Sequence, residues 1–319
     1  MNRSIRIVVL DEGHLLDGGL AWNEVASAGE LTVYAHTAPD DVIRRSEGAQ
    51  ILLTNKTPLS ASTIGALPEL KFISVLATGY NVVDGAAAKA RGIPVSNVPA
   101  YGTESVAQHV FALLLEMCNS VGLHADAVAR GEWAASGKWC APQTKVTALA
   151  GRRLGLIGRG RIAQRVAEIG RAFGMEVLMA SPSVPGGGAG LSPLEETIRT
   201  ADVLSLHCQL TQENAGMVDA AFFGRMKQEA FLINTARGAL INEADLANAL
   251  QSGTIKAAVL DVLTTEPPQA DHPLCLLPNC LITPHMAWMG VPARKCLLEV
   301  TAENIRAFLA GRPVNVVNG

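Results

Sequence analysis

The stretch RRLGLIGRGRIAQRVAEIGRAFGMEVLMAS, residues 152–181, decides the fold. An apolar strand leads into a GxGxxA turn formed by Gly158, Gly160 and Ala163, and a helix with one apolar face follows. In such a turn the first glycine allows the tight bend, the second lets a pyrophosphate approach bare backbone, and Ala163 is small enough for the helix to pack on the strand. Free N–H groups at the helix start attract phosphate, and Arg161 adds positive charge. A glycine-rich turn can also be purely structural, but the flanking strands and helix favour a dinucleotide-binding βαβ unit.

Short apolar runs alternate with helical patterns along most of the remaining chain, which indicates an α/β protein with parallel sheets. The stretch 130–147 is rich in glycine, serine and polar residues and is interpreted as a loop. Long helices are expected from about Thr103 and over about 291–310. The expected strands are 5–10, 51–54, 72–77, 154–157, 177–180, 203–206, 231–234, 257–260 and 281–283.

The composition is that of a folded protein without an affinity for polyanions. Of 319 residues, 49% are apolar and 17% are charged, which excludes extended disorder, and the net charge of −3 argues against a nucleic-acid or anionic-membrane binder. The longest apolar run, 110–117, is far shorter than the ~20 residues of a membrane span, and the N-terminus lacks a signal-peptide pattern. Six cysteines are scattered without metal-ligand spacing, so no metal site is expected. These features predict a soluble, cytoplasmic protein.

Three residues with reactive or charged side chains each follow an apolar run late in the chain: Arg237 in NTARGAL, Glu266 in DVLTTEPP and His285 in TPHMAW. Each residue also has a purely structural interpretation: Arg237 as a surface arginine, Glu266 as a solvated loop acid and His285 as a hydrogen-bonded histidine of the core. Together they lie at the carboxyl ends of expected parallel strands, where open α/β sheets bind ligands. Arginine binds a carboxylate and a carbonyl through its planar donors, histidine gives a proton to a new alkoxide, and glutamate orients the imidazole. With a dinucleotide turn, this set predicts reduction of a 2-keto acid by a nicotinamide hydride.

Three further residues bear on the cofactor and the substrate. Ser181 stands at the end of the second strand of the dinucleotide unit, where an NAD-specific site usually carries Asp or Glu. Serine does not repel a 2′-phosphate, yet no arginine follows to bind one, so NADP is permitted and NAD is not excluded. His207 ends another strand and is expected to line the cofactor, while Trp288 either shields the substrate from water or packs in the core. Four other histidines lack such a context and are expected to be solvated or packed: His14, His36, His109 and His124.

Over nearly its whole length the chain resembles the D-isomer-specific 2-hydroxyacid dehydrogenases, and its TPHMAW and DVLTTEPP segments are most similar to the glycerate dehydrogenase/hydroxypyruvate reductase branch. The resemblance implies two Rossmann-like domains with parallel sheets, in which a cofactor domain (101–286) is inserted into a smaller flavodoxin-like substrate domain (1–100 and 287–319). It also implies an active-site cleft that closes by a hinge, and a homodimer. The similar segments are ATGYNVVD (77–84), NVPAYGTESVAQHVFALLL (97–115), LGLIGRGRIA (154–163), NTARGALINEADL (234–246), DVLTTEPP (261–268) and TPHMAW (283–288).

The resemblance implies that Arg237 binds the substrate, that His285 is the acid/base and that Glu266 orients it. The residues expected to contact the substrate are Thr78, Gly79, Arg237, His285 and Trp288. Those expected to contact the cofactor are Thr103, Gly158, Gly160, Arg161, Ile162, Ser181, His207, Thr235, Ala236, Arg237 and Asp261. The expected reaction is the reversible reduction of a small 2-keto acid, hydroxypyruvate or glyoxylate favoured, to the D-2-hydroxy acid by NADH or NADPH. Two alternatives stay open. One is oxidation of formate, which Glu266 argues against, because formate oxidation forms no alkoxide that needs a proton from the histidine. The other is a nucleotide-sensing, co-repressor-like protein without significant turnover.

Overall fold

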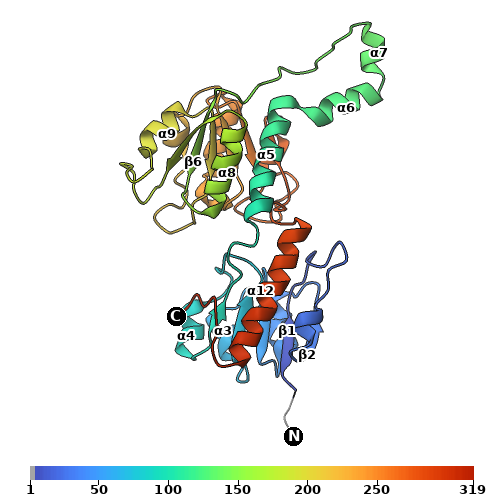
Figure 1. Ribbon diagram of the computed structural model, residues 1–319, viewed down its shortest axis with the longest axis vertical. Helices are drawn as coiled ribbons and strands as arrows, with labels where there is room; N and C mark the ends of the chain where they lie inside the picture. The colour runs from blue at the N-terminus through green and yellow to red at the C-terminus, as the bar shows by residue number, and fades with distance from the viewer. Residues whose placement is uncertain (1–3) are drawn as a thin grey trace. The chain divides into compact units, whose positions relative to one another are not determined.

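The computed structural model describes residues 4–319, which divide into two compact units (Figure 1). The terminal unit combines the residues up to Gly102 with Met289–Gly319, and the inserted unit is Thr103–Trp288. Each unit has its own parallel sheet with helices around it. The prediction of two α/β units with parallel sheets is therefore confirmed.

The terminal unit has a five-stranded sheet in the order β2-β1-β3-β4-β5, which is the flavodoxin-like order. Its strands are β1 (Arg6–Val9), β2 (Glu30–Val33), β3 (Ile51–Thr54), β4 (Phe72–Val75) and β5 (Val95–Ser96). The sequence does not predict β2. This strand lies at the edge of the sheet and none of its four residues is buried, so its sequence ELTV lacks the continuous apolar character that predicts β3 and β4.

Helices cover both faces of the terminal sheet. On one face α12, from the far end of the chain, packs against the sheet at β4 (Figure 1). There Phe308 stacks on Phe72 with ring centroids 4.5 Å apart. On the other face Ile64 and Ala88 join a buried cluster with Ile73. The C-terminal helix therefore completes the core of the unit that begins at the N-terminus. The elements are α1 (Asn23–Ala26), a 3-10 turn (Pro39–Asp41), α2 (Val42–Ser46), α3 (Ala61–Gly65), α4 (Gly85–Ala90) and α12 (Val291–Leu309).

The inserted unit has a six-stranded parallel sheet in the order β11-β10-β9-β8-β6-β7. The strands are β6 (Arg153–Ile157), β7 (Glu176–Ala180), β8 (Val203–Leu206), β9 (Phe231–Asn234), β10 (Ala257–Leu260) and β11 (Cys280–Ile282). The three central strands β8, β9 and β10 are buried along their whole length, which explains why continuous apolar runs predict them. From β6 the chain passes to β7 on one side and then to β8 on the other side of β6. The strand order reverses there, so the carboxyl end of β6 is a topological switch point.

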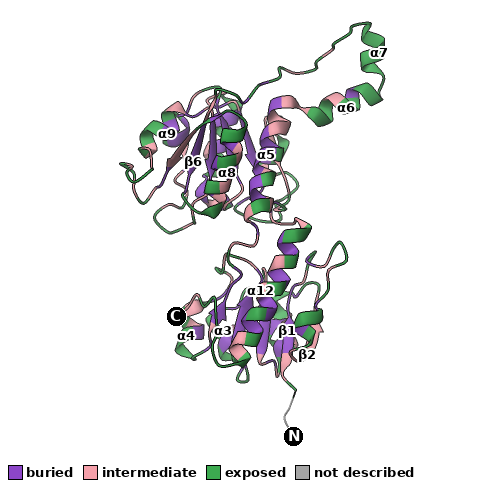
Figure 2. Ribbon diagram, viewed as in Figure 1, coloured by how far each residue is buried: buried purple, intermediate pink, exposed green. Residues whose placement is uncertain are grey.

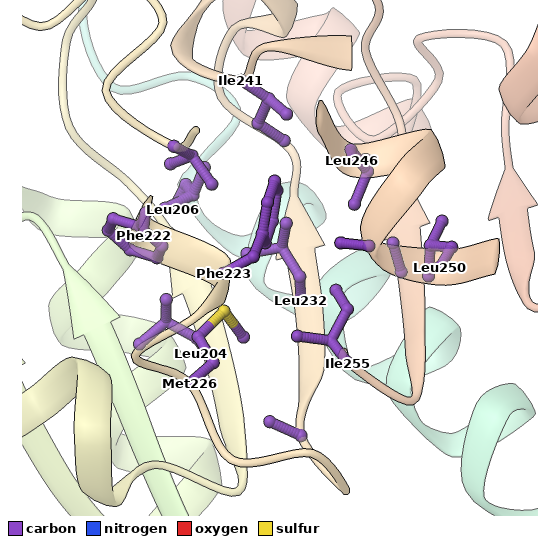
Figure 3. Packing of buried hydrophobic residues seen from close by; sticks show 14 of the residues in the cluster. Leu204, Leu206, Phe222, Phe223, Met226, Leu232, Ile241, Leu246, Leu250 and Ile255 are labelled. Atoms are coloured by element: carbon purple, nitrogen blue, oxygen red, sulfur yellow. The ribbon is translucent and has the colours of Figure 1, made fainter. Parts of the chain in front are cut away.

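Each face of this sheet has its own apolar core. On one face Leu204 and Leu232 pack against Phe223 and Leu250, which belong to two helices above the sheet (Figure 3). On the opposite face Ile233 joins a second buried cluster with residues of α5 and α8. The elements around the sheet are α5 (Thr103–Asn119), α8 (Arg161–Ala172), α9 (Leu194–Thr200), α10 (Ala220–Phe223), a 3-10 turn (Gly238–Leu240), α11 (Glu243–Gln251) and a 3-10 turn (Pro273–Leu276).

Between α5 and β6 the chain leaves the body of the inserted unit as an arm, residues 121–147 (Figures 1 and 2). The arm contains α6 (Val121–Ala129) and α7 (Glu132–Ser136), and most of its residues are exposed. The interpretation of 130–147 as loop is wrong over α7, a five-residue helix that is too short to give a periodic apolar pattern. Over the described residues no single helix is long and apolar enough to cross a membrane; α5 and α6 together meet that length and composition, but the chain bends by 56° between them.

Candidate active site

The dinucleotide turn lies at the carboxyl end of β6, where the chain passes into α8. Gly158 has a φ of +134°, and a Cβ atom there would lie 2.4 Å from the backbone carbon and oxygen of His207. Only glycine allows this close approach between the turn and the end of β8. Gly160, by contrast, has no atom within 4 Å of such a Cβ position, and no side chain caps the first N–H groups of α8. The turn therefore presents bare backbone and the uncapped start of a helix.

The residues around this turn fit a nicotinamide dinucleotide. The start of a helix with free N–H groups favours phosphate, and Arg161 is exposed there with Ile162 beside it. Thr235 directly follows β9, and its hydroxyl is buried without a hydrogen-bond partner among residues 4–319. A buried hydroxyl without a partner is costly, and a bound ligand would satisfy it. Ala236, the next residue, is half-buried at the same edge of the sheet.

Ser181 and His207 directly follow β7 and β8, the two strands that flank β6. Ser181 is buried and its hydroxyl lies 2.9 Å from the hydroxyl of Ser183, so the position carries no charge. The Nε2 atom of His207 lies 2.9 Å from the Ser205 hydroxyl, and burial lowers the pKa of His207 to about 4. His207 is therefore neutral at pH 7 and adds no positive charge to the dinucleotide turn.

His285 and Glu266 form a short polar contact at the carboxyl edge of this sheet. The Nδ1 atom of His285 lies 2.6 Å from Oε2 of Glu266, and both side chains are partly exposed. The other carboxylate oxygen of Glu266 accepts the backbone N–H of Leu263 at 3.0 Å. Because Glu266 engages Nδ1, the imidazole is oriented to exchange a proton with a substrate through Nε2.

The backbone of His285 adopts the left-handed conformation, with a φ of +52°, which is uncommon for a residue other than glycine. Three contacts hold it there. Its N–H donates to the Thr283 carbonyl, and its carbonyl accepts the indole N–H of Trp288, each at 2.9 Å. The next N–H, that of Met286, donates to Asp261 at 2.9 Å. Trp288 thus packs against the histidine loop through its polar edge.

Asp261, which the sequence assigns to the cofactor, anchors this loop. Its carboxylate is 1% exposed and accepts the Thr283 hydroxyl at 2.6 Å and the backbone N–H groups of Met286 and Ala287 at 2.9 Å each. Burial, the largest influence, raises the pKa of Asp261. Hydrogen bonds from His109, Thr283 and the two backbone groups outweigh burial and hold the pKa below its ordinary value. Asp261 therefore stays ionised and fixes the turn that carries His285.

His109 is a residue whose connection to this site the sequence does not predict. Its Nε2 atom lies 3.1 Å from the Thr283 hydroxyl and 3.4 Å from Asp261. As expected it is packed, but its partners belong to the histidine loop. The signal that would have found it is its place on α5 within the segment 97–115, one of the similar segments quoted above.

Arg237 follows β9 and is exposed. Its turn is shaped by the buried side chain of Asn234, which donates to the Arg237 carbonyl at 2.8 Å and accepts the Ala236 N–H at 2.9 Å. A Cβ atom on Gly238 would lie within 2.3 Å of the peptide that joins Leu263 to Thr264, so this turn lies directly against the loop of Glu266. Since β9, β10 and β11 are neighbours, Arg237, Glu266 and His285 follow adjacent strands at one edge.

Thr78 and Gly79 belong to the terminal unit and follow β4. Their loop is held by the segment after β5: the Thr78 hydroxyl donates to the Val98 carbonyl at 2.9 Å, and the Asn97 amide donates to the Thr78 carbonyl at 2.7 Å. Thr78 is exposed, and Thr103 begins α5 of the inserted unit. The structure thus groups Arg237, Glu266 and His285 in one unit and places Thr78 and Gly79 in the other.

Comparisons with known proteins match this geometry. Residues 111–287 match the model of the family described as D-isomer specific 2-hydroxyacid dehydrogenase, NAD binding domain. A hydroxypyruvate reductase of Blautia hydrogenotrophica is 43% identical, covering 98% of this chain and 100% of that protein. A glycerate dehydrogenase of Methylorubrum extorquens is 41% identical over 88% of both chains.

Among solved structures, an NADPH-dependent glyoxylate/hydroxypyruvate reductase from Sinorhizobium meliloti, in complex with NADP and malonate, superposes with a TM-score of 0.83. It is 27% identical, and the match covers 98% of this chain and 96% of that one. Both the sequence match and the fold extend over nearly the whole chain. The chain therefore belongs to the family of D-isomer-specific 2-hydroxyacid dehydrogenases and is an NAD(P)-dependent oxidoreductase acting on CH–OH donors.

Proposed function

We propose that this protein reduces hydroxypyruvate or glyoxylate reversibly to the D-2-hydroxy acid with NADH or NADPH. The observation that carries the proposal is the 2.6 Å contact between Glu266, which follows β10, and His285, which follows β11. Arg237 follows β9, the neighbour of β10 in the same sheet. The names of the similar proteins support the same substrates: hydroxypyruvate reductase, glycerate dehydrogenase and glyoxylate reductase. Reduction of a keto acid by hydride needs an anion-binding group and a proton donor, and this edge of the sheet provides both.

A bound nicotinamide supplies the hydride for the keto carbon. Arg237 binds the substrate carboxylate and carbonyl through its planar donors. His285 gives the proton from Nε2 to the carbonyl oxygen as the alkoxide develops, and Glu266 stabilises the imidazolium form through Nδ1. In the reverse direction the same imidazole accepts the proton. Thr78 and Gly79 are proposed as further substrate-binding residues on the family resemblance alone.

The alternative, a nucleotide-sensing protein without turnover, is less well supported. A sensor needs the dinucleotide turn but does not need a histidine held at 2.6 Å by a carboxylate at the sheet edge that also carries an exposed arginine. The two functions differ in one measurable property, since only the enzyme oxidises NADH or NADPH in the presence of a keto acid.

The test is a steady-state assay at 340 nm with hydroxypyruvate and glyoxylate, each with NADH and NADPH. We expect His285→Ala to lower kcat by roughly 10²–10⁴-fold, because it removes the general acid. The matched control is His14→Ala, which removes a histidine that also lies 2.9 Å from a carboxylate, that of Asp17, but in the terminal unit and on the surface. Unchanged turnover in His285→Ala would overturn the mechanism. Nucleotide binding without turnover of either acid would favour another substrate or the sensing function.

We also propose that the protein is a homodimer in which the arm, residues 121–147, packs against a second copy. Several large apolar side chains of the arm are exposed, and Trp139 is 91% exposed. Clustered apolar exposure of this kind marks protein–protein interfaces. The exposed side chains are Val121, Leu123, Val128, Trp133, Trp139 and Val146.

Light scattering after size-exclusion chromatography tests the dimer. Leu123→Glu with Trp139→Glu should convert a dimer to a monomer. Leu276→Glu is the control, because Leu276 is 68% exposed in the same unit but outside the arm. A wild-type monomer, or a dimer that survives the double substitution, would contradict the role of the arm.

The cytoplasm is the proposed compartment. All six cysteines are free thiols in the structure, as expected in a reducing environment. Recovery of the native protein in the periplasmic fraction of a bacterial host would contradict this proposal.

A further inference from the structure

We propose that Glu243 is a positioning residue that holds the loop of Glu266 in its catalytic conformation; this rests on the proposed function. Glu243 is the first residue of α11 and is distant in sequence from Glu266. Its carboxylate is hydrogen-bonded to Thr264 and His272, so we expect its effect on catalysis to pass through the loop that joins Thr264 to Glu266. The sequence does not assign it a role.

The carboxylate of Glu243 is held at both oxygens. Oε1 accepts the backbone N–H of Thr264 at 2.6 Å, and Oε2 lies 3.2 Å from Nε2 of His272. Glu243 and His272 are each only 20% exposed. The Nδ1 atom of His272 is buried without a hydrogen-bond partner among the described residues, so the ring acts as a donor through Nε2, toward Glu243. His272 thus orients the Glu243 carboxylate, and this carboxylate in turn holds the backbone N–H of Thr264.

Thr264 is clamped from two sides. Glu243 holds its N–H, and the backbone of Gly238 packs so closely against the Leu263–Thr264 peptide that no Cβ atom fits between them. The same peptide begins the loop that returns to Glu266, whose Oε1 accepts the Leu263 N–H at 3.0 Å. Because Leu263 is both part of this clamped peptide and a donor to Glu266, a shift of Thr264 moves the catalytic carboxylate.

A displaced Glu266 weakens its contact with His285. The contact is 2.6 Å long, and small displacements of a catalytic group cost large factors in rate. Arg237 follows a different strand, β9, and its turn is shaped separately by Asn234. Loss of Glu243 is therefore expected to lower kcat more than it raises the KM for the keto acid.

The experiment compares Glu243→Ala, Glu243→Gln and His272→Ala with Asp245→Ala in the full chain. Asp245 is the matched control, because it lies on the same helix turn and its carboxylate also accepts a backbone N–H, that of Ala220 at 3.1 Å, but away from the Glu266 loop. The readouts are kcat and KM in the keto-acid assay and, in the protein without substrate, the proton NMR signal of the imidazole N–H shared with Glu266.

We expect Glu243→Ala to lower kcat roughly tenfold with KM changed less than twofold, and to broaden or shift the imidazole signal. His272→Ala should have a smaller effect in the same direction. Glu243→Gln should retain most of the activity, because its amide oxygen still accepts the Thr264 N–H. Asp245→Ala should change neither readout. An unchanged imidazole signal in Glu243→Ala would overturn the proposal. If the wild type fails to turn over keto acids, the NMR signal still tests the positioning role separately.

Discussion

The two units share a strand order around their switch points, but the residues that follow the switch-point strand differ in charge and size. In the terminal sheet β1 lies between β2 and β3, and in the inserted sheet β6 lies between β7 and β8. Open α/β sheets bind ligands at such points, in the crevice outside the carboxyl ends of the strands. Topology alone therefore offers one crevice in each unit.

In the terminal unit a carboxylate of the protein itself occupies the backbone N–H groups at the switch point. Asp11, two residues after β1, is 7% exposed, and its carboxylate accepts three consecutive backbone N–H groups after β3 at 2.5–2.7 Å, those of Asn55, Lys56 and Thr57. These are the kind of backbone donors that bind phosphate elsewhere. The side chain of Asp11 uses them internally.

In the inserted unit the turn after the switch-point strand carries glycines and no carboxylate. Gly158 follows β6 directly and Gly160 leaves the start of α8 without a side-chain cap. The helix donors stay available, and the family model for NAD binding covers this unit. The two units have the same strand order around the switch point, so we infer that the side chain in the first turn after the switch-point strand decides which sheet accepts a nucleotide.

The largest expected effect is on NADH affinity, and it comes from the substitution Gly160→Asp, which places a carboxylate at the switch point of the inserted unit, as Asp11 does in the terminal unit. A carboxylate within a few Å of the pyrophosphate should weaken NADH binding roughly 100-fold or more. The fold should tolerate it, because Gly160 has a φ of −70° and open space around it, and aspartate is a favourable N-cap residue. Fluorescence titration with NADH and thermal unfolding measure the two effects. Gly160→Ala is the control for size, and unaltered NADH affinity in Gly160→Asp would refute the comparison.

The second prediction removes the anion from the terminal unit. Asp11→Ala leaves three backbone N–H groups without their acceptor and should lower the free energy of unfolding by about 2–4 kcal/mol. NADH affinity should be unchanged, because the dinucleotide turn belongs to the other unit. Asp17→Ala is the control: Asp17 is a surface carboxylate, and its loss should cost less than about 1 kcal/mol. Urea unfolding curves of the three proteins decide the matter. Equal stability of the two variants would mean that Asp11 does not hold the loop.

The same contrast explains what the sequence does and does not predict. The strands of the inserted unit are predicted to within one or two residues, because β8, β9 and β10 are buried on both faces and appear as continuous apolar runs. Arg237 and Glu266 are singled out because they follow such runs, and His285 because it follows the shorter apolar run of β11. β2 is not predicted, because an exposed edge strand does not need apolar residues on either face.

The residues that shape the site are harder to predict. Asp11, Asp261 and Glu243 act through hydrogen bonds to loops that follow other strands. A local pattern contains no information about which distant N–H group a buried carboxylate accepts. Asp261 illustrates this: the family resemblance implies a place near the cofactor but does not predict its hydrogen bonds to the loop of His285.

The third prediction concerns pH and the neutral imidazole at the open switch point. The pKa of His207 is about 4 in the folded protein, below the ~6.5 of an unperturbed histidine. The unfolded chain therefore binds the proton first as the pH falls, and stability is lost between about pH 6.5 and 4. At pH 5 the loss from this group should be about 2 kcal/mol relative to pH 7. Urea unfolding of wild type and His207→Gln at both pH values measures it: the substitution should reduce the acid loss by that amount, and identical losses would show that His207 is not buried in its neutral form.

The smallest expected effect concerns the cofactor's ribose. Ser181 ends β7 on the other side of β6, and its uncharged hydroxyl lies 2.9 Å from that of Ser183. Ser181→Asp introduces a carboxylate that accepts ribose hydroxyl groups but repels a 2′-phosphate, so the ratio of kcat/KM for NADPH to that for NADH should fall roughly tenfold. Ser181→Ala removes the hydroxyl without adding charge and should leave the ratio within about twofold. If both substitutions change the ratio equally, charge at this position does not select the cofactor. If only Ser181→Asp does, the rule drawn from Asp11 and Gly158 extends to the next strand: at this edge of the sheet, a single carboxylate decides which phosphate the protein accepts.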